Sequence, residues 1–175
     1  MEKSLETRII EKLPKRKLIR YDMLPVITDR ELKSEITEYL SEPYIGKVDL
    51  VAAPEAIGWI LGNNVANRLG VDFLPIRRGN KLPYEEDDLY RVSFMDYQLK
   101  RKSLEIVKDT QLDGKRILIC DEWIETGAQI KAVLALLSKF DCEIVGISTI
   151  FIRDNERTRE WNEEGLLTYI GKDWD

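Results

Sequence analysis

Short apolar runs alternate along this chain with segments whose apolar residues recur at helical spacing. Runs with the length and composition of buried strands lie at 48–53, 73–76, 103–107, 116–120 and 142–152. Helical spacing is found at about 2–13, after the capping pair Thr28-Asp29, at 58–69 and at 130–140. This alternation predicts an α/β fold with a doubly wound, mostly parallel sheet.

Composition limits the chemistry that such a fold can perform. The 175 residues are most simply one domain, and a net charge of −5 argues against a general nucleic-acid-binding surface. There is no histidine, which excludes Ser-His and Cys-His catalytic pairs and most transition-metal sites. Cys120 and Cys142 lie in apolar runs without CxxC spacing, as buried cysteines in a reducing compartment do.

The sequence also predicts a cytoplasmic protein without a membrane segment. Its first ten residues, MEKSLETRII, are too charged for a signal peptide, and no apolar run is long enough to span a bilayer. Any bound cation is expected to be a hard one held by oxygen atoms, such as Mg²⁺.

The stretch ILICDEWIETGAQ, residues 117–129, carries the most specific chemistry. An apolar run leads into Asp121 and Glu122, and Thr126-Gly127 follows just before a predicted helix. Two carboxylates can accept hydrogen bonds from vicinal ribose hydroxyls, and the free N–H groups of a helix N-terminus suit a phosphate. We therefore predict a ribose-phosphate site. Its 5′-phosphate would be held by Glu125, Thr126, Gly127, Ala128 and Gln129.

A second loop is expected to face the same site. Ligands of parallel sheets bind at the carboxyl ends of the strands. The acidic pair lies at one such end, and Pro54-Glu55 lies at another.

Residues 117–129 resemble the signature of type I phosphoribosyltransferases, in which four apolar residues precede an acidic pair and a Thr-Gly turn. Further segments are similar to purine enzymes of that family, above all those that act on adenine, and follow in the family's order. They lie at residues 21–27, 53–58, 75–83, 96–97 and 104–106.

The resemblance implies an activity. A purine base would take the phosphoribosyl group of phosphoribosyl pyrophosphate through an oxocarbenium-like transition state, releasing pyrophosphate and a nucleoside monophosphate. It implies Mg²⁺ carried by the substrate, with Asp121 as one candidate protein ligand. It implies pyrophosphate binding by Arg77, Arg78 and Lys81, and by the loop Glu55, Ala56, Ile57 and Gly58.

The resemblance also implies a flexible lid at about 79–102 and a small hood built from about 1–27 and 153–175. Asp96 and Tyr97 of the lid join Asp121 and Glu122 as catalytic candidates. Tyr21, Met23 and Trp174 are the base-binding candidates in the hood. Members of the family commonly form dimers, so a homodimer is expected.

Several positions depart from the family's pattern. Glu125 and Gln129 replace small or hydroxyl residues of the phosphate loop, Ala128 replaces a frequent glycine, and Ile57 replaces an arginine of adenine enzymes. These departures leave the base open between adenine and the oxopurines, with a pyrimidine as a weaker possibility. They also favour an alternative function, a non-catalytic regulator that binds phosphoribosyl pyrophosphate or a nucleotide.

Overall fold

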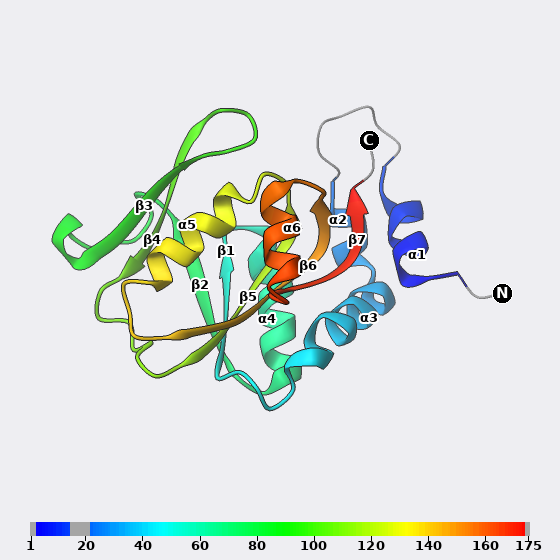
Figure 1. Cartoon of the computed structure of the whole chain (residues 1–175), viewed down its shortest axis with the longest axis horizontal. Helices are drawn as coiled ribbons and strands as arrows, with labels where there is room; N and C mark the ends of the chain where they lie inside the picture. The colour runs from blue at the N-terminus through cyan, green and yellow to red at the C-terminus, as the bar shows by residue number, and fades with distance from the viewer. Residues whose placement is uncertain (1–2, 15–21, 174–175) are drawn as a thin grey trace.

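The structure, a computed structural model, describes residues 3–14 and 22–173. Within them, seven strands form one sheet in the order β3-β4-β2-β1-β5-β6-β7 (Figure 1). Neighbouring strands in the part β2-β1-β5-β6-β7 pair parallel to each other. Strand β4 pairs antiparallel with both β2 and β3. The prediction of an α/β fold with a mostly parallel sheet is therefore confirmed.

The strands are short, apart from two long ones beside the site. Their bounds are β1 Leu50–Pro54, β2 Asp72–Arg78, β3 Leu89–Met95, β4 Arg101–Val107, β5 Arg116–Ile124, β6 Glu143–Arg153 and β7 Leu167–Asp173. The helices are α1 Leu5–Lys12, α2 Leu24–Thr28, α3 Arg30–Ser41, α4 Ile57–Leu69, α5 Ala128–Leu137 and α6 Glu156–Glu163. Two 3₁₀ turns, η1 Glu42–Tyr44 and η2 Glu86–Asp88, complete the described elements.

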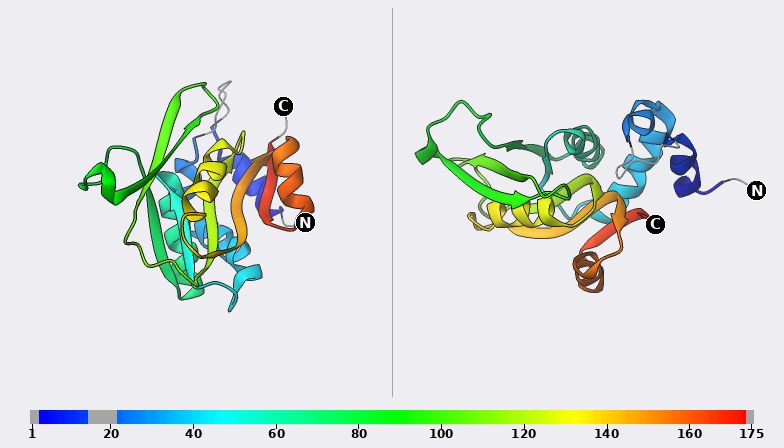
Figure 2. Two further views of the ribbon diagram at one scale, coloured as in Figure 1. Left: turned by 60° about the vertical axis from the view of Figure 1, so that its left-hand side comes forward. Right: turned by 90° about the horizontal axis from the view of Figure 1, so that it is seen from above.

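Helices cover both faces of the sheet, as Figure 2 shows in the view from above. Helices α1 to α4 lie on one face, where Val51, Leu118 and Ile150 belong to one buried cluster. Helices α5 and α6 lie on the other face, over a second cluster around Ile119 and Val133. The alternation of inward and outward side chains along the central strands supplies both cores.

The expected end of one strand and the expected start of one helix were wrong. The apolar run at 116–120 was expected to end before the acidic pair, but β5 continues to Ile124, so Asp121 and Glu122 lie inside a strand. Strand pairing explains the extension, because Asp121 pairs with Thr149 and Trp123 with Phe151 of β6. The helix after the turn begins at Ala128, two residues earlier than expected.

The segment at 79–102, which the resemblance assigns to a flexible lid, contains regular structure. Strands β3 and β4 form an antiparallel hairpin that projects from the sheet beside α5 (Figures 1 and 2). Pairing between Val92 and Leu104, and between Phe94 and Lys102, organises a segment whose many charged residues hide the strand period. The mobility of a lid remains a prediction.

The two ends of the described chain meet at the other edge of the sheet. Helix α1 contacts both α3 and β7, and β7 pairs with β6 as an edge strand (Figure 1). A Cβ on Gly171 would lie only 2.5 Å from the carboxylate of Glu6 and from the ring of Phe151, so a glycine is needed where α1 crosses β7. The segments predicted to form a hood are thus neighbours.

Candidate functional site

A cavity of about 300 Å³ opens at the carboxyl ends of β1 and β5, beside the β3–β4 hairpin. Most of the predicted site residues line it. The lining consists of residues 55–57, Arg78, Phe94, Asp96, Tyr97, Lys102 and residues 121–130. The structure therefore brings together the acidic pair, the loop predicted to hold phosphate and four residues of the predicted lid.

Asp121 is the most buried polar side chain of the cavity, with 1% of its surface exposed. One carboxylate oxygen, Oδ1, accepts a hydrogen bond from the Glu122 amide at 3.0 Å. The other, Oδ2, accepts from the Gln129 side chain at 2.9 Å. A Cβ on Gly58 would lie 3.0 Å from Oδ1, so the glycine lets α4 pack directly against this carboxylate.

The environment of Asp121 disfavours its negative charge. Burial raises the pKa of this carboxyl well above its usual value, and the neighbouring Glu122 raises it further. The hydrogen bond from Gln129 works in the opposite direction and is too weak to compensate. A pair of carboxylates in such a place favours ligands that donate hydrogen bonds or bring positive charge.

The loop between β5 and α5 has the geometry of an anion site. Gly127 has a φ of 73°, and a Cβ there would lie 2.6 Å from Arg157 Cδ, so the position requires glycine for two reasons. The Thr126 hydroxyl accepts a hydrogen bond from the Ala128 amide at 3.3 Å. The first turn of α5 directs its N–H groups toward the loop, where they carry a partial positive charge.

Glu125 does not place an unbalanced charge beside this loop. Its carboxylate lies 3.3 Å from the guanidinium of Arg153, at the end of β6, and its side chain is only 12% exposed. The main chain is held as well, because Asn155 donates to the Glu125 carbonyl at 2.7 Å and Arg157 donates to the Thr126 carbonyl at 3.1 Å.

The supporting residues from α6 were missed in the sequence. A usable signal existed, because Asn155 and Thr158 form a capping box that marks the start of α6. Their spacing is visible in the sequence, but that a helix there would hold the phosphate loop is a tertiary feature.

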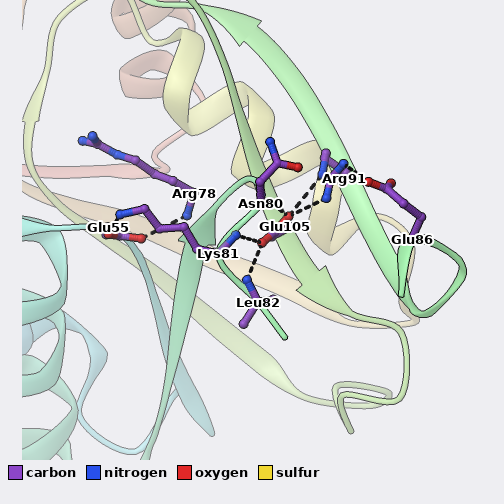
Figure 3. Close-up of polar contacts among 8 residues, drawn as sticks. All are labelled: Glu55, Arg78, Asn80, Lys81, Leu82, Glu86, Arg91 and Glu105. Atoms are coloured by element: carbon purple, nitrogen blue, oxygen red, sulfur yellow. Dashed lines mark hydrogen bonds and ion pairs between the residues drawn. The ribbon is translucent and has the colours of Figure 1, made fainter. Parts of the chain in front are cut away.

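Glu55 organises the cations predicted to bind pyrophosphate. The Glu55–Ala56 peptide is cis. The Glu55 carboxylate lies 2.9 Å from Lys81 Nζ and accepts a hydrogen bond from the Arg78 amide at 3.2 Å (Figure 3). It also lies 3.3 Å from Arg77 Nε. Burial raises the pKa of Glu55, but hydrogen bonds from Lys81 and the Arg78 amide outweigh it, so the net pKa is lowered.

The two adjacent arginines point to different places, as neighbours on a strand do. Arg78 lines the cavity, and Figure 3 shows its side chain extending past Glu55 and away from Glu105. Arg77 instead stacks its guanidinium over the ring of Trp59 at 5.2 Å. Arg77 and Lys81 are not among the cavity-lining residues.

Glu105 fixes the loop that carries Lys81. Its side chain is fully buried and accepts backbone hydrogen bonds from Asn80, Lys81 and Leu82 at 2.9 to 3.0 Å. Arg91 of β3 adds two more N–H donors at 3.0 and 3.1 Å (Figure 3). Burial raises the pKa of Glu105, but these donors together lower it below its usual value.

Asp96 and Tyr97 lie at the tip of the hairpin and face the cavity. Asp96 accepts from the amides of Gln98 and Lys100, and its carboxylate lies 2.6 Å from Lys102 Nζ. Lys102 is the main cause that lowers the pKa of Asp96 to about 2. Lys102, which the sequence did not single out as a site residue, also lines the cavity.

The candidates for base binding are placed less directly. Met23 is buried in the core between α2 and the sheet, with 2% exposed, and is not among the residues that line the cavity. Tyr21 and Trp174 lie outside the described residues. Phe94, Trp123 and Ile130, which sequence reasoning missed, supply apolar lining.

Within residues 3–14 and 22–173, no group of three or more acidic or sulfur side chains gathers as a metal site does. The acidic pair offers two carboxylates, which supply oxygen atoms of the kind that Mg²⁺ prefers. Because Mg²⁺ requires an octahedral shell, the pair can hold this ion only together with oxygen atoms of a bound substrate. The helices of this described part are also too short or too polar to cross a membrane.

Comparisons with known proteins agree with this geometry. Residues 28–167 match the phosphoribosyl transferase domain family. The chain is 33% identical over 171 residues to an adenine phosphoribosyltransferase of Rhodopirellula baltica, covering 95% of this chain and 81% of that protein. A relative of the same name from Acidobacterium capsulatum is 33% identical over 167 residues, with 93% and 90% covered. The crystal structure of adenine phosphoribosyltransferase from Thermoanaerobacter pseudethanolicus has a TM-score of 0.82 at 29% identity, with 96% and 99% covered.

Proposed function

This chain belongs to the phosphoribosyl transferase domain family, and on that premise we propose that it transfers the phosphoribosyl group of phosphoribosyl pyrophosphate to adenine. The purine class follows from relatives that are 33% identical over most of the chain and carry the name adenine phosphoribosyltransferase. The observation that carries the proposal is the acidic pair and the glycine turn in the wall of one cavity. The products are a nucleoside monophosphate and pyrophosphate.

The acidic pair and the loop after it would hold the ribose phosphate. In this assignment, Asp121 and Glu122 accept hydrogen bonds from the two vicinal ribose hydroxyls. The 5′-phosphate sits at the N-terminus of α5, on the N–H groups of its first turn and the hydroxyl of Thr126. The closeness of Glu125 to Arg153 supports this assignment, because the pairing reduces the repulsion that a carboxylate would exert on phosphate.

The departing pyrophosphate would leave toward β2 and the hairpin. Arg78 is the first candidate to bind it, because its guanidinium lines the cavity and can contact phosphate oxygens bidentately. Lys81, held by Glu55 at the same edge, adds positive charge nearby. These cations stabilise the charge that develops on the leaving group as the glycosidic bond breaks.

The hairpin would close over the bound substrate. Asp96 and Tyr97 lie at its tip and line the cavity, so a small movement of the hairpin changes the access of water. Exclusion of water matters because water competes with the base for the activated sugar.

The residues present fit a magnesium ion that arrives with its substrate. Asp121 and Glu122 can contribute oxygen ligands, and the pyrophosphate and ribose oxygens of the substrate would complete the shell. When bound, the ion supplies charge stabilisation to the leaving pyrophosphate. We expect activity to be lost in a chelator and restored by added Mg²⁺.

The test is an assay with separate bases. The protein is incubated with phosphoribosyl pyrophosphate, Mg²⁺ and either adenine, hypoxanthine, guanine or uracil, and nucleotide formation is followed by chromatography. Product with adenine alone is the expected result. Product with an oxopurine instead would change the base but keep the reaction. No product with any base, from folded protein that binds the substrate, would make the chain a binding protein.

A matched pair of variants ties the activity to the glycine turn. Gly127→Ala and Gly165→Ala both place alanine at a φ near +72°, so the backbone strain is similar. The new methyl group meets Arg157 and Trp161 in the first variant and open space in the second. We expect Gly127→Ala to raise the KM for phosphoribosyl pyrophosphate by about tenfold or more and Gly165→Ala to leave it unchanged.

We also propose a cytoplasmic homodimer. The cytoplasm is supported by Cys120 and Cys142, which are free thiols in this structure, and the dimer by the resemblance to the family. Size-exclusion chromatography with light scattering would give the mass in solution. A value near 20.4 kDa, the mass of one chain, would overturn the proposal of a dimer.

A further inference from the structure

Gln129 makes a contact that its place in the phosphate loop does not predict. It lies in the first turn of α5, two residues after Gly127, where the sequence suggested a donor to phosphate. Its Nε2 donates instead to Asp121 Oδ2 at 2.9 Å, across the turn between β5 and α5. The amide thus joins the phosphate loop to the buried acid.

We propose that Gln129 is a positioning residue, which fixes the carboxylate of Asp121 in the orientation that binds the ribose hydroxyls. The inference rests on the proposed function, because it assigns the hydroxyls to Asp121. Gln129 acts in it through Asp121 and does not touch the substrate.

The contacts around Asp121 support this role. The Glu122 amide holds Oδ1 at 3.0 Å, and α4 packs so close that a Cβ on Gly58 would lie 3.0 Å from the same oxygen. Gln129 holds Oδ2, so each oxygen has one donor of its own. Each carboxylate oxygen can accept about two hydrogen bonds, and a hydrogen bond with the Glu122 side chain uses part of the remaining capacity, so the rest is open to a ligand hydroxyl.

The chemistry of an amide suits the task better than its alternatives. Glu122 repels Asp121, so without a donor on Oδ2 the carboxylate can gain by rotating away from its neighbour. A lysine or arginine here would neutralise the acid and compete with a ligand for it. The neutral amide of Gln129 orients the carboxyl group of Asp121 without adding a charge that would compete with a ligand.

The inference is tested by the binding of two nucleotides that differ only in the ribose hydroxyls. AMP and 2′,3′-dideoxy-AMP are titrated into the wild-type protein and into Gln129→Met, which keeps the length of the side chain and removes the donor. We expect the wild type to bind AMP more tightly. In Gln129→Met the ratio of the two dissociation constants should fall by about tenfold, as expected for a lost charge-assisted hydrogen bond.

The opposite assignment gives a different result. If Gln129 contacts the 5′-phosphate, both nucleotides weaken together in Gln129→Met and the ratio is unchanged, which overturns the inference. A wild type that binds both nucleotides equally also overturns it, because Asp121 then reads no hydroxyl. Binding of neither nucleotide would overturn the proposed function, and the inference with it.

Two further variants guard against an indirect effect. Gln129→Asn keeps an amide but shortens the side chain by one methylene, so the ratio should fall as in Gln129→Met; it replaces that variant if the latter does not fold. Lys131→Met changes an exposed residue of the same helix and should leave the ratio as in the wild type. A similar fall of the ratio in Lys131→Met would overturn the inference.

Discussion

Two buried carboxylates, Glu105 of β4 and Asp121 of β5, are each 1% exposed and lie in one sheet, yet the protein surrounds them in opposite ways. Glu105 receives five N–H donors from the Asn80–Leu82 loop and from Arg91. Asp121 receives two, and its nearest charged neighbour is another acid, Glu122.

The difference appears in the proton affinity of the two groups. Burial raises the pKa of both carboxyl groups. Hydrogen-bond donors bring the pKa of Glu105 below its usual value, whereas the pKa of Asp121 stays well above its usual value. A carboxylate whose hydrogen bonds are all supplied by the protein holds structure together. One that is left short of donors is available to a ligand, and its folded state is less favourable until that ligand binds.

The largest effect is expected when the satisfied carboxylate is removed. Glu105→Gln should lower the free energy of unfolding by about 3 kcal/mol, because the buried donors of Arg91 and the loop amides lose a charged acceptor. Urea denaturation measures the change. Glu86→Gln is the matched control, because Glu86 pairs with the same Arg91 but is 76% exposed, and its loss should cost less than about 1 kcal/mol. Equal losses in both variants would contradict the comparison.

Removal of the unsatisfied carboxylate should have the reverse outcome. Asp121→Asn keeps the shape and relieves the repulsion from Glu122, so the free energy of unfolding at pH 7 should stay the same or rise. Turnover should fall by about 100-fold, because an amide nitrogen replaces one of the two oxygens that can accept hydrogen bonds from the ribose hydroxyls. Steady-state kinetics and urea denaturation measure the two effects.

The control is Asp109→Asn, an exposed acid outside the cavity, which should change neither quantity. A large loss of stability in Asp121→Asn would place Asp121 with Glu105, as a structural group, and remove the distinction between them.

The pH dependence of stability separates the two carboxylates in a smaller effect. The folded pKa of Glu105 is lowered from 4.5, so its stabilisation is complete above that value and is lost as the pH falls through the folded pKa. The folded pKa of Asp121 is raised from 3.8. Between 3.8 and the folded pKa, the folded state holds a proton that the unfolded chain has released. The free energy of unfolding therefore falls as the pH rises from 3.8 to the folded pKa.

Unfolding free energies in magnesium-free buffer between about pH 5 and pH 8 test this. The difference in unfolding free energy between the wild type and Glu105→Gln should be constant over that pH range. The gap by which Asp121→Asn exceeds the wild type should widen with pH. A constant gap for both would show that Asp121 does not change its protonation state between about pH 5 and pH 8, which contradicts the expected widening.

Sequence pattern was sufficient for the parallel sheet and for the acidic pair, because both depend on local signals. The apolar runs that become β1 and β5 are continuous in the sequence. The turn at Gly127 is recognised by residue type and spacing alone.

The missed features depend on pairing between distant segments. The hairpin of β3 and β4 is stabilised by cross-strand pairs such as Tyr90 with Ile106, which no local period reveals. The split of Arg77 and Arg78 between Trp59 and the cavity follows from the register of β2 on β4. The five donors on Glu105 come from residues 14 to 25 positions away, so the sequence suggested only a strand there.

Glu125 provides the smallest test, because this cavity carboxylate has a cation beside it, as Glu105 has, and lies next to the proposed phosphate site. Its carboxylate lies 3.3 Å from the guanidinium of Arg153, and the Arg153 side chain is 40% exposed. Arg153→Gln should therefore weaken the binding of ribose 5-phosphate by about threefold, because the charge of Glu125 then repels the phosphate through partly screened surroundings. Glu125→Gln alone should change it by less, and the double variant should return it near the wild-type value. Isothermal titration at low and high salt measures the three constants. If the double variant binds as weakly as Arg153→Gln, then Arg153 acts on the phosphate itself, and Glu125 belongs with the satisfied carboxylates.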